Sequence, residues 1–455
     1  MKKGVVILFL TFLMMVQSVS AISNVQHSVD GDKVTLTYQG NPPFWINIRG
    51  DTSIGQSGGY LWAKTNSNTF TYDMGFAINP SKKFYYGVKD NNWGEIYYFE
   101  IGLPEDNVLK EACNGYLKEF DDIRGNLKHL PTFKDISQCD LSNVDSNFMN
   151  TLIFNEETVW PNSNKLPINF NPTELANKGM NPGMGIKDLH EQGITGQGVN
   201  VAIIDQPMFR DHPEYNGKII EYYDIGCENC DTSMHGPAVA SLLVGKNIGV
   251  APGAGLYFAG VPSWLANSAY YANALNWIIE TNEALPTSEK IKVVSVSANP
   301  SGHPFTKNTN MWTESVALAK REGIHVIDVS GGKEGDICAG WYDLNNPNNL
   351  KTFSLGFPDG NPWSDPKCIH VPNSQRTTAR EYDERSNFGY NYWGQGGLSW
   401  GIPYASGVLA LGWQVNPDLS YEEIMNLLFA SAHITNNGAK VINPKEFINL
   451  VKATI

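Results

Sequence analysis

The chain has 455 residues, which is longer than one ordinary domain and predicts two or three domains. Hydrophobic residues make up 42% of it and charged residues 17%, so it can bury a sizeable core, which argues against global disorder. The formal net charge of −13 argues against nucleic acid as a partner, because an acidic surface repels a polyanion.

The first residues show the pattern of a secretory signal peptide. Lys2 and Lys3 precede an apolar run over residues 5–16, and small residues follow as far as Ala21. We therefore expect residues 1–21 to be cleaved and the mature protein to be secreted. An uncleaved anchor is the alternative, but the run is shorter than the roughly 20 residues that span a bilayer. No later stretch is long and apolar enough to span one, so we expect no integral membrane span after cleavage.

Residues 22–103 have strand-like alternation. Lys33–Tyr38 and Phe44–Ile48 are predicted strands, and residues 83–88 and 95–100 flank a turn-rich stretch that predicts a hairpin. We predict a small, β-rich, sandwich-like domain. Its many aromatic side chains are expected mainly in the core and in cross-strand pairs. A face that contacts glycans or a cell surface is the alternative interpretation.

Residues 104–182 show no clear periodicity. The prolines that punctuate this stretch, Pro161, Pro167, Pro172 and Pro182, predict a linker. The whole of residues 22–182 is either a propeptide removed on maturation or a retained binding module.

From residue 183 to residue 455 predicted strands alternate with predicted helices. The strands are residues 199–204, 256–261, 291–298 and 325–329, and the helices are residues 268–285, 312–321, 401–414, 421–432 and 444–451. This alternation predicts an α/β fold with a parallel sheet covered by helices on both faces.

Three polar residues in this region form a candidate catalytic set. Asp205 follows a buried strand, at the edge where open α/β sheets place their sites. His235 and Ser399 each open an apolar helix, and backbone N–H groups at a helix N-terminus favour a developing oxyanion. Singly, each has an ordinary structural interpretation as a turn or cap residue. Together they provide a nucleophile, a base and a carboxylate that orients the base.

A different hydrolase is one rival interpretation. Ser399 also fits a G-x-S-x-G elbow, with Asp418 and His433 following in the α/β-hydrolase order. That elbow needs a buried strand before the serine. Residues 387–396 instead predict turns, which disfavours this interpretation.

The region from about Gly183 onward resembles the subtilisin-like (subtilase) serine peptidase family. The segment 196–205 is similar to the family's Asp motif, and 211–213 to the His-Pro segment that follows it. Residues 235–245 and 249–254 resemble the HGTHVAG helix and the GVAP turn, and residues 399–407 resemble GTSMASPHVAG. The order Asp, His, Ser is that of the family.

The resemblance implies a serine endopeptidase that acts on polypeptides. Ser399 would be the nucleophile, His235 the general base and acid, and Asp205 the residue that orients the imidazole. Ser297, Ala298 and Asn299 would bind extended substrate by strand addition. The Ser399 backbone N–H would contribute to the oxyanion hole.

The sequence departs from the family at several site positions. The family's oxyanion asparagine aligns with Gly332, which has no side chain, and losing such a donor typically costs about 10²–10³ in turnover. Leu398 and Trp400 replace the Thr and Met beside the serine, and Ala238 replaces the second His of the helix motif. These departures motivate the alternative of a catalytically weak or silent subtilase-fold binding or regulatory protein.

The sequence requires no cofactor, and its cysteines favour disulfides. The even number, six, fits an oxidising compartment. Cys227 and Cys230 form a single CxxC, which favours a local disulfide over zinc because no second pair accompanies it. Calcium often accompanies the family, and the acidic stretch Glu221–Asp231 is the candidate, although its spacing matches no defined calcium loop.

Overall fold

The computed structural model describes residues 23–30, 33–39, 44–49, 61–73, 84–89, 97–101, 135–226, 232–302, 304–330, 337–358, 367–381 and 387–455. The predicted signal peptide, residues 1–21, lies outside them. Contacts divide the chain into two units, Met1–Leu103 and Pro104–Ile455.

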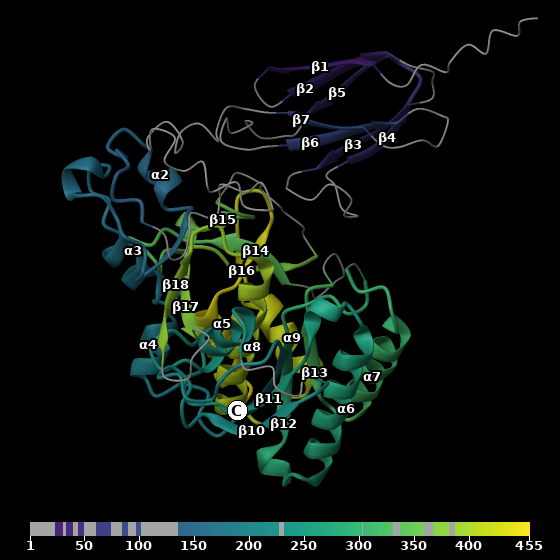
Figure 1. Ribbon diagram of the computed structural model, residues 1–455. Coiled ribbons are helices and arrows are strands. Elements are labelled where there is room, and N and C mark those ends of the chain that lie inside the picture. The colour runs from purple at the N-terminus through teal and green to yellow at the C-terminus, as the bar shows by residue number, and fades with distance from the viewer. Residues whose placement is uncertain are drawn as a thin grey trace, which may run out of the picture. The chain divides into compact units, whose positions relative to one another are not determined.

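The N-terminal unit consists of two antiparallel sheets (Figure 1). One has the order β1-β2-β5, with β1 Ser23–Asp30, β2 Lys33–Gln39 and β5 Thr69–Asp73. The other has the order β4-β3-β6-β7, with β4 Leu61–Thr65, β3 Phe44–Arg49, β6 Phe84–Lys89 and β7 Tyr97–Ile101. The rings of Tyr38 and Phe44, both fully buried, meet edge to face at 4.7 Å between centroids. The β-rich prediction and the hairpin of β6 and β7 are confirmed.

The second unit is built on a parallel sheet of the order β10-β11-β9-β12-β13 (Figure 1). Its strands are β9 Asn200–Asp205, β10 Ile219–Asp224, β11 Gly255–Gly260, β12 Ile291–Val296 and β13 His325–Asp328. The helices that flank it are α5 His235–Val244, α6 Ser268–Ala284, α7 Thr309–Arg321 and α8 Leu398–Val415. The predicted α/β fold is confirmed.

The central strand β9 shows why this sheet is covered on both faces. Side chains alternate along a strand, so Val201 and Ile203 share one face while Ala202 and Ile204 share the other. The first pair belongs to the core formed with α5 and α8, and the second to the core formed with α6 and α7. A strand buried on both sides is a continuous apolar run, and the polar residues of β9, Asn200 and Asp205, come only at its two ends.

Smaller sheets and helices complete this unit. One sheet has the order β15-β14-β16-β20-β19, with β14 Ile337–Trp341, β15 Ser354–Leu355, β16 Ile369–Pro372, β19 His433–Ile434 and β20 Lys440–Val441. Another is antiparallel, of the order β17-β18-β8, with β8 Ile153–Asn155, β17 Arg376–Glu381 and β18 Phe388–Trp393. The remaining helices are α2 Ser146–Met149, α3 Pro172–Gly179, α4 Ile186–Glu191, α9 Tyr421–Ala430 and α10 Pro444–Lys452. None of the helices in the described residues is long and apolar enough to cross a bilayer.

Two segments differ from their predictions. Residues 135–182 lie in the stretch predicted as a linker, yet β8 pairs with β18 there, and Leu152 and Phe154 are buried in the main core. Residues 387–396 were expected to form turns but include strand β18. Glycine and asparagine weaken its strand signal, while the buried face of the antiparallel sheet, occupied by Tyr392, stabilises it.

Candidate active site

Asp205 ends the central strand and is nearly inaccessible, with 2% of its surface exposed. One carboxylate oxygen, Oδ1, accepts a hydrogen bond from the backbone N–H of Gln206 at 2.7 Å. The same oxygen lies 2.6 Å from Nδ1 of His235. The carboxylate therefore fixes the position of the imidazole and makes Nδ1 the protonated nitrogen.

His235 is the first residue of α5, and two local features place it beside Asp205. The Ser233 hydroxyl accepts hydrogen bonds from the backbone N–H groups of His235 and Gly236, each at 3.2 Å, and so caps the helix. A Cβ on Gly236 would lie 2.1 Å from the carbonyl oxygen of Gln206. Only glycine allows the helix to approach the end of β9 this closely.

The electrostatics of this pair suit a general base. Burial lowers the pKa of His235, but the charge of Asp205 and the hydrogen bond to it outweigh burial, so the pKa of His235 is raised above 6.5. The His235 side chain is 19% exposed, whereas the Asp205 side chain is 3% exposed. Part of the imidazole thus remains accessible, while its carboxylate partner is not.

Ser399 lies in the first turn of α8 and forms a reciprocal pair with Ser297, which follows β12. The Ser399 hydroxyl donates to the Ser297 carbonyl at 3.2 Å, and the Ser297 hydroxyl donates to the Ser399 carbonyl at 2.8 Å. In a regular helix the Ser399 carbonyl would accept from the N–H of residue 403, but that residue is Pro403, which has none. The Ser297 hydroxyl replaces the missing donor and anchors the start of α8 to the sheet.

Trp400 brings the two helix N-termini into contact. Its indole ring lies 5.1 Å from the His235 ring and 5.4 Å from the Trp393 ring, measured between centroids. Helices α5 and α8 lie side by side in Figure 1. The structure therefore pairs Asp205 with His235 directly, and it places the residue that follows Ser399 against that histidine.

The segment predicted to bind substrate follows β12 at the same edge of the sheet. The Ala298 carbonyl accepts a hydrogen bond from the backbone N–H of Val329 at 3.0 Å. The Asn299 side chain accepts from the Ser301 hydroxyl at 2.7 Å. Ala298 and Asn299 are partly exposed, whereas Ser297 is buried against Ser399. The predicted oxyanion position Gly332 lies outside the described residues.

The sequence did not reveal the role of Glu381, a buried carboxylate at the end of β17. It accepts hydrogen bonds from the Phe209 backbone N–H at 2.7 Å and from the hydroxyls of Tyr215 and Thr232. Thr232 directly precedes the Ser233 cap, so Glu381 ties that cap to the segment after Asp205. No motif marks a glutamate at a strand end, and only the tertiary structure exposes this role.

The rival elbow geometry is not what the chain adopts. A strand does precede Ser399, contrary to the predicted turns, but it is β18 of the small antiparallel sheet rather than a strand of the parallel one. His433 lies in β19 and pairs with Val441. Asp418 is an exposed residue of the turn between α8 and α9.

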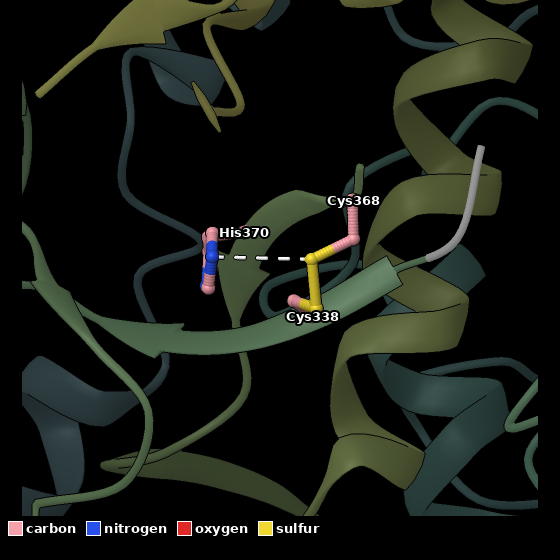
Figure 2. Close-up of side chains that lie close together, drawn as sticks. All are labelled: Cys338, Cys368 and His370. Atoms are coloured by element: carbon pink, nitrogen blue, oxygen red, sulfur yellow. Dashed lines mark hydrogen bonds between the residues drawn. A yellow bond between two sulfur atoms is a disulfide. The ribbon is translucent and has the colours of Figure 1, made fainter. Parts of the chain in front are cut away.

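Figure 2 shows the one cluster of metal-ligand residue types found among the described residues, Cys338, Cys368 and His370. Both cysteines are consumed by a disulfide between them, so neither offers a thiolate. His370 lies with Nε2 3.9 Å from the Cys368 sulfur and Nδ1 2.7 Å from the Ala339 carbonyl. Cys227 and Cys230 lie outside the described residues, as does the end of the acidic stretch Glu221–Asp231, so calcium stays a prediction.

Comparisons with a family model and with curated proteins agree on one family. Residues 196–447 match the model of the subtilase family, described as Peptidase_S8. The chain is 24% identical over 300 residues to subtilisin-like protease PopC of Myxococcus xanthus (strain DK1622), covering 58% of this chain and 62% of that protein. It is 26% identical over 278 residues to serine protease AprX of Bacillus subtilis (strain 168), covering 52% of this chain and 62% of that protein. The chain thus spans less than two thirds of either relative.

Among solved structures, the chain is similar to fervidolysin from Fervidobacterium pennivorans, described as a keratinolytic enzyme related to subtilisin. The TM-score is 0.44 at 17% identity, and the match covers 60% of this chain and 45% of that one.

Proposed function

This chain belongs to the subtilase family of serine peptidases, and we propose that it is a secreted endopeptidase that cleaves polypeptides through an acyl-enzyme. The observation that carries the proposal is the 2.6 Å contact between Asp205 Oδ1 and His235 Nδ1, beside the helix start that holds Ser399. A protein that had lost catalysis would be under no requirement to keep a buried carboxylate on a histidine of raised pKa.

Each residue of the set has a chemical role in this proposal. The Ser399 oxygen attacks the scissile carbonyl while His235 Nε2 removes its proton. His235 then returns that proton to the leaving amine, and Asp205 stabilises the imidazolium between the two steps. Water attacks the acyl-enzyme with the same base, releasing the second product.

The start of α8 supports the developing negative charge. N–H groups in the first turn of a helix have no intrahelical acceptor, and the helix dipole adds positive potential there. The Ser399 N–H is therefore the first oxyanion donor in our proposal. Extended substrate would lie along residues 297–299 and continue the sheet by main-chain hydrogen bonds.

Labelling with a fluorophosphonate serine probe tests the proposal. We expect the full chain, after secretion and any processing, to be labelled, and Ser399→Ala to lose the label entirely. Ser288→Ala is the matched control, because Ser288 is an exposed serine just before β12, at the opposite end of that strand from the proposed substrate segment. It should label like wild type and should cleave a denatured protein substrate at a similar rate.

Absence of labelling in folded, processed wild type would refute the endopeptidase. The Gly332 departure would then favour a catalytically silent subtilase-fold binding protein. Labelling that persists in Ser399→Ala would show that another residue reacts, and would refute the assignment of the nucleophile.

A further inference from the structure

Arg376, at the start of β17, is a buried cation without a carboxylate partner. Only 1% of its surface is exposed. Its Nη1 donates to the Asn181 carbonyl at 2.9 Å and to the Tyr342 hydroxyl at 2.8 Å. Both acceptors are uncharged, and among the described residues no carboxylate pairs with this guanidinium.

The other edge of the guanidinium, Nε and Nη2, has no hydrogen-bond partner among the described residues, although both atoms are buried. This is the edge with which arginine binds planar or spherical anions through two parallel N–H groups. The nearest acid on the same strand, Glu381, is five positions away and therefore points to the opposite face of the sheet.

Tyr404, from helix α8, adds a second unpartnered donor. Its hydroxyl is buried, and no protein atom among the described residues accepts from it. Burial and Tyr342, whose hydroxyl accepts from Arg376, raise the pKa of Tyr404, while the Arg376 charge lowers it by less. The Tyr404 hydroxyl remains protonated and can donate.

The positive charge of Arg376 indicates that the ligand of these unpartnered N–H and O–H donors is an anion. A buried charge is strongly unfavourable unless it is paired, and arginine does not escape by losing its proton. A water molecule would satisfy the hydrogen bonds but would leave the charge uncompensated. The donors are closed off from solvent, which excludes any large or macromolecular anion.

We propose that a single halide-sized inorganic anion, chloride under ordinary conditions, binds at the Nε–Nη2 edge of Arg376 with the Tyr404 hydroxyl as a further donor. The anion is structural: it neutralises the guanidinium and joins β17 to α8. This site includes none of Asp205, His235 and Ser399, so the inference does not depend on the proposed peptidase activity.

Thermal unfolding in different salts tests the inference. The full chain carrying Ser399→Ala, which prevents self-digestion, is unfolded in about 150 mM sodium chloride, bromide or gluconate, so that ionic strength is constant. Gluconate is too large for a closed site. We expect Tm to be about 2 °C or more higher in either halide than in gluconate, because the halide binds only the folded chain. Crystals soaked in bromide should show an anomalous peak beside Nε and Nη2 of Arg376.

Variants assign the effect to the site. Arg376→Met should abolish the difference between halide and gluconate, and Tyr404→Phe, which removes one oxygen, should reduce it. Arg321→Met, at an exposed position of α7, is the matched control and should retain the full difference. If Arg376→Met fails to fold, wild type and Tyr404→Phe still decide the question. Equal Tm values in all three salts, or only water beside Arg376 in the bromide crystals, would overturn the inference.

Discussion

The start of α8 provides a stability prediction that can be worked out from its hydrogen bonds. Pro403 deprives the Ser399 carbonyl of its helical donor, and the Ser297 hydroxyl, 7% exposed as a residue, supplies a substitute at 2.8 Å. Ser297→Ala leaves that carbonyl without a donor in a largely dry environment. An unsatisfied group of this kind costs about 1–3 kcal/mol.

The same logic predicts rescue by a second change. Pro403→Ala restores an N–H four residues after the carbonyl, so it should stabilise Ser297→Ala by about 1 kcal/mol more than it stabilises the parent chain. The assay is denaturant unfolding of the four members of the cycle, all in the inactive Ser399→Ala background, which keeps the backbone carbonyl. Ser431→Ala is the matched control. The Ser431 hydroxyl also donates to a backbone carbonyl at 2.8 Å, that of Leu428, but this carbonyl is not one that Pro403 deprives of a donor. Pro403→Ala should therefore not rescue Ser431→Ala. Equal stabilisation by Pro403→Ala with and without Ser297 would refute the reasoning.

Three further predictions concern the catalytic set and the disulfide. Asp205→Asn should reduce kcat by about 10⁴-fold, because the imidazole loses both its fixed tautomer and its counter-charge; steady-state kinetics on a peptide substrate measure this. Since the folded-state pKa of His235 is raised above 6.5, its protonation should stabilise the fold fully below pH 6.5, and this contribution should vanish as pH rises through the raised pKa. Peptidase activity should increase over that same interval, because the base must be neutral. The pH profile of kcat/KM of the wild type measures the activity trend. The pH profiles of Tm of Ser399→Ala, with and without the further change His235→Gln, measure the stability trend. Replacing Cys338 and Cys368 together with alanine should lower the free energy of unfolding by about 3–4 kcal/mol, given their sequence separation of 30, and urea titration would contradict this with an unchanged midpoint.

The sequence predicts four of the five strands of the parallel sheet because each of these four has a strong local signal. The fifth strand, β10, was not predicted, because it lies at the edge of the sheet and none of its side chains is fully buried. Strand β9 is a continuous apolar run that ends in an acid, and helix α6, Ser268–Ala284, lies within one residue of its predicted end. Such elements are buried on one or both faces along their whole length. Periodicity alone then identifies them.

The helices and strands that were not predicted from the sequence are stabilised mainly by contacts with other parts of the fold. Pro172, predicted to mark a linker, instead opens α3 at a position where the missing N–H is not needed, and Asn171 caps that helix. Strand β18 contains Gly389 and Asn391, which weaken its propensity, yet it pairs on both sides with β17 and β8. A proline or a glycine gives the same local sequence signal in a loop as in these packed segments. Only tertiary contacts therefore distinguish a loop from a packed segment.

The departures beside Ser399 become intelligible once the packing is known. Trp400, in place of the family's methionine, lies against both His235 and Trp393 and is 4% exposed, so it forms a wall of the site. A wall residue changes the shape and the polarity around the histidine while leaving its contact with Asp205 intact. In the proposed peptidase the change at Gly332 differs in kind, because the asparagine that the family has at the aligned position would supply a donor to the reacting centre. Under the proposed function, we therefore expect the change at Trp400 to affect which substrates fit and the change at Gly332 to affect the rate of reaction.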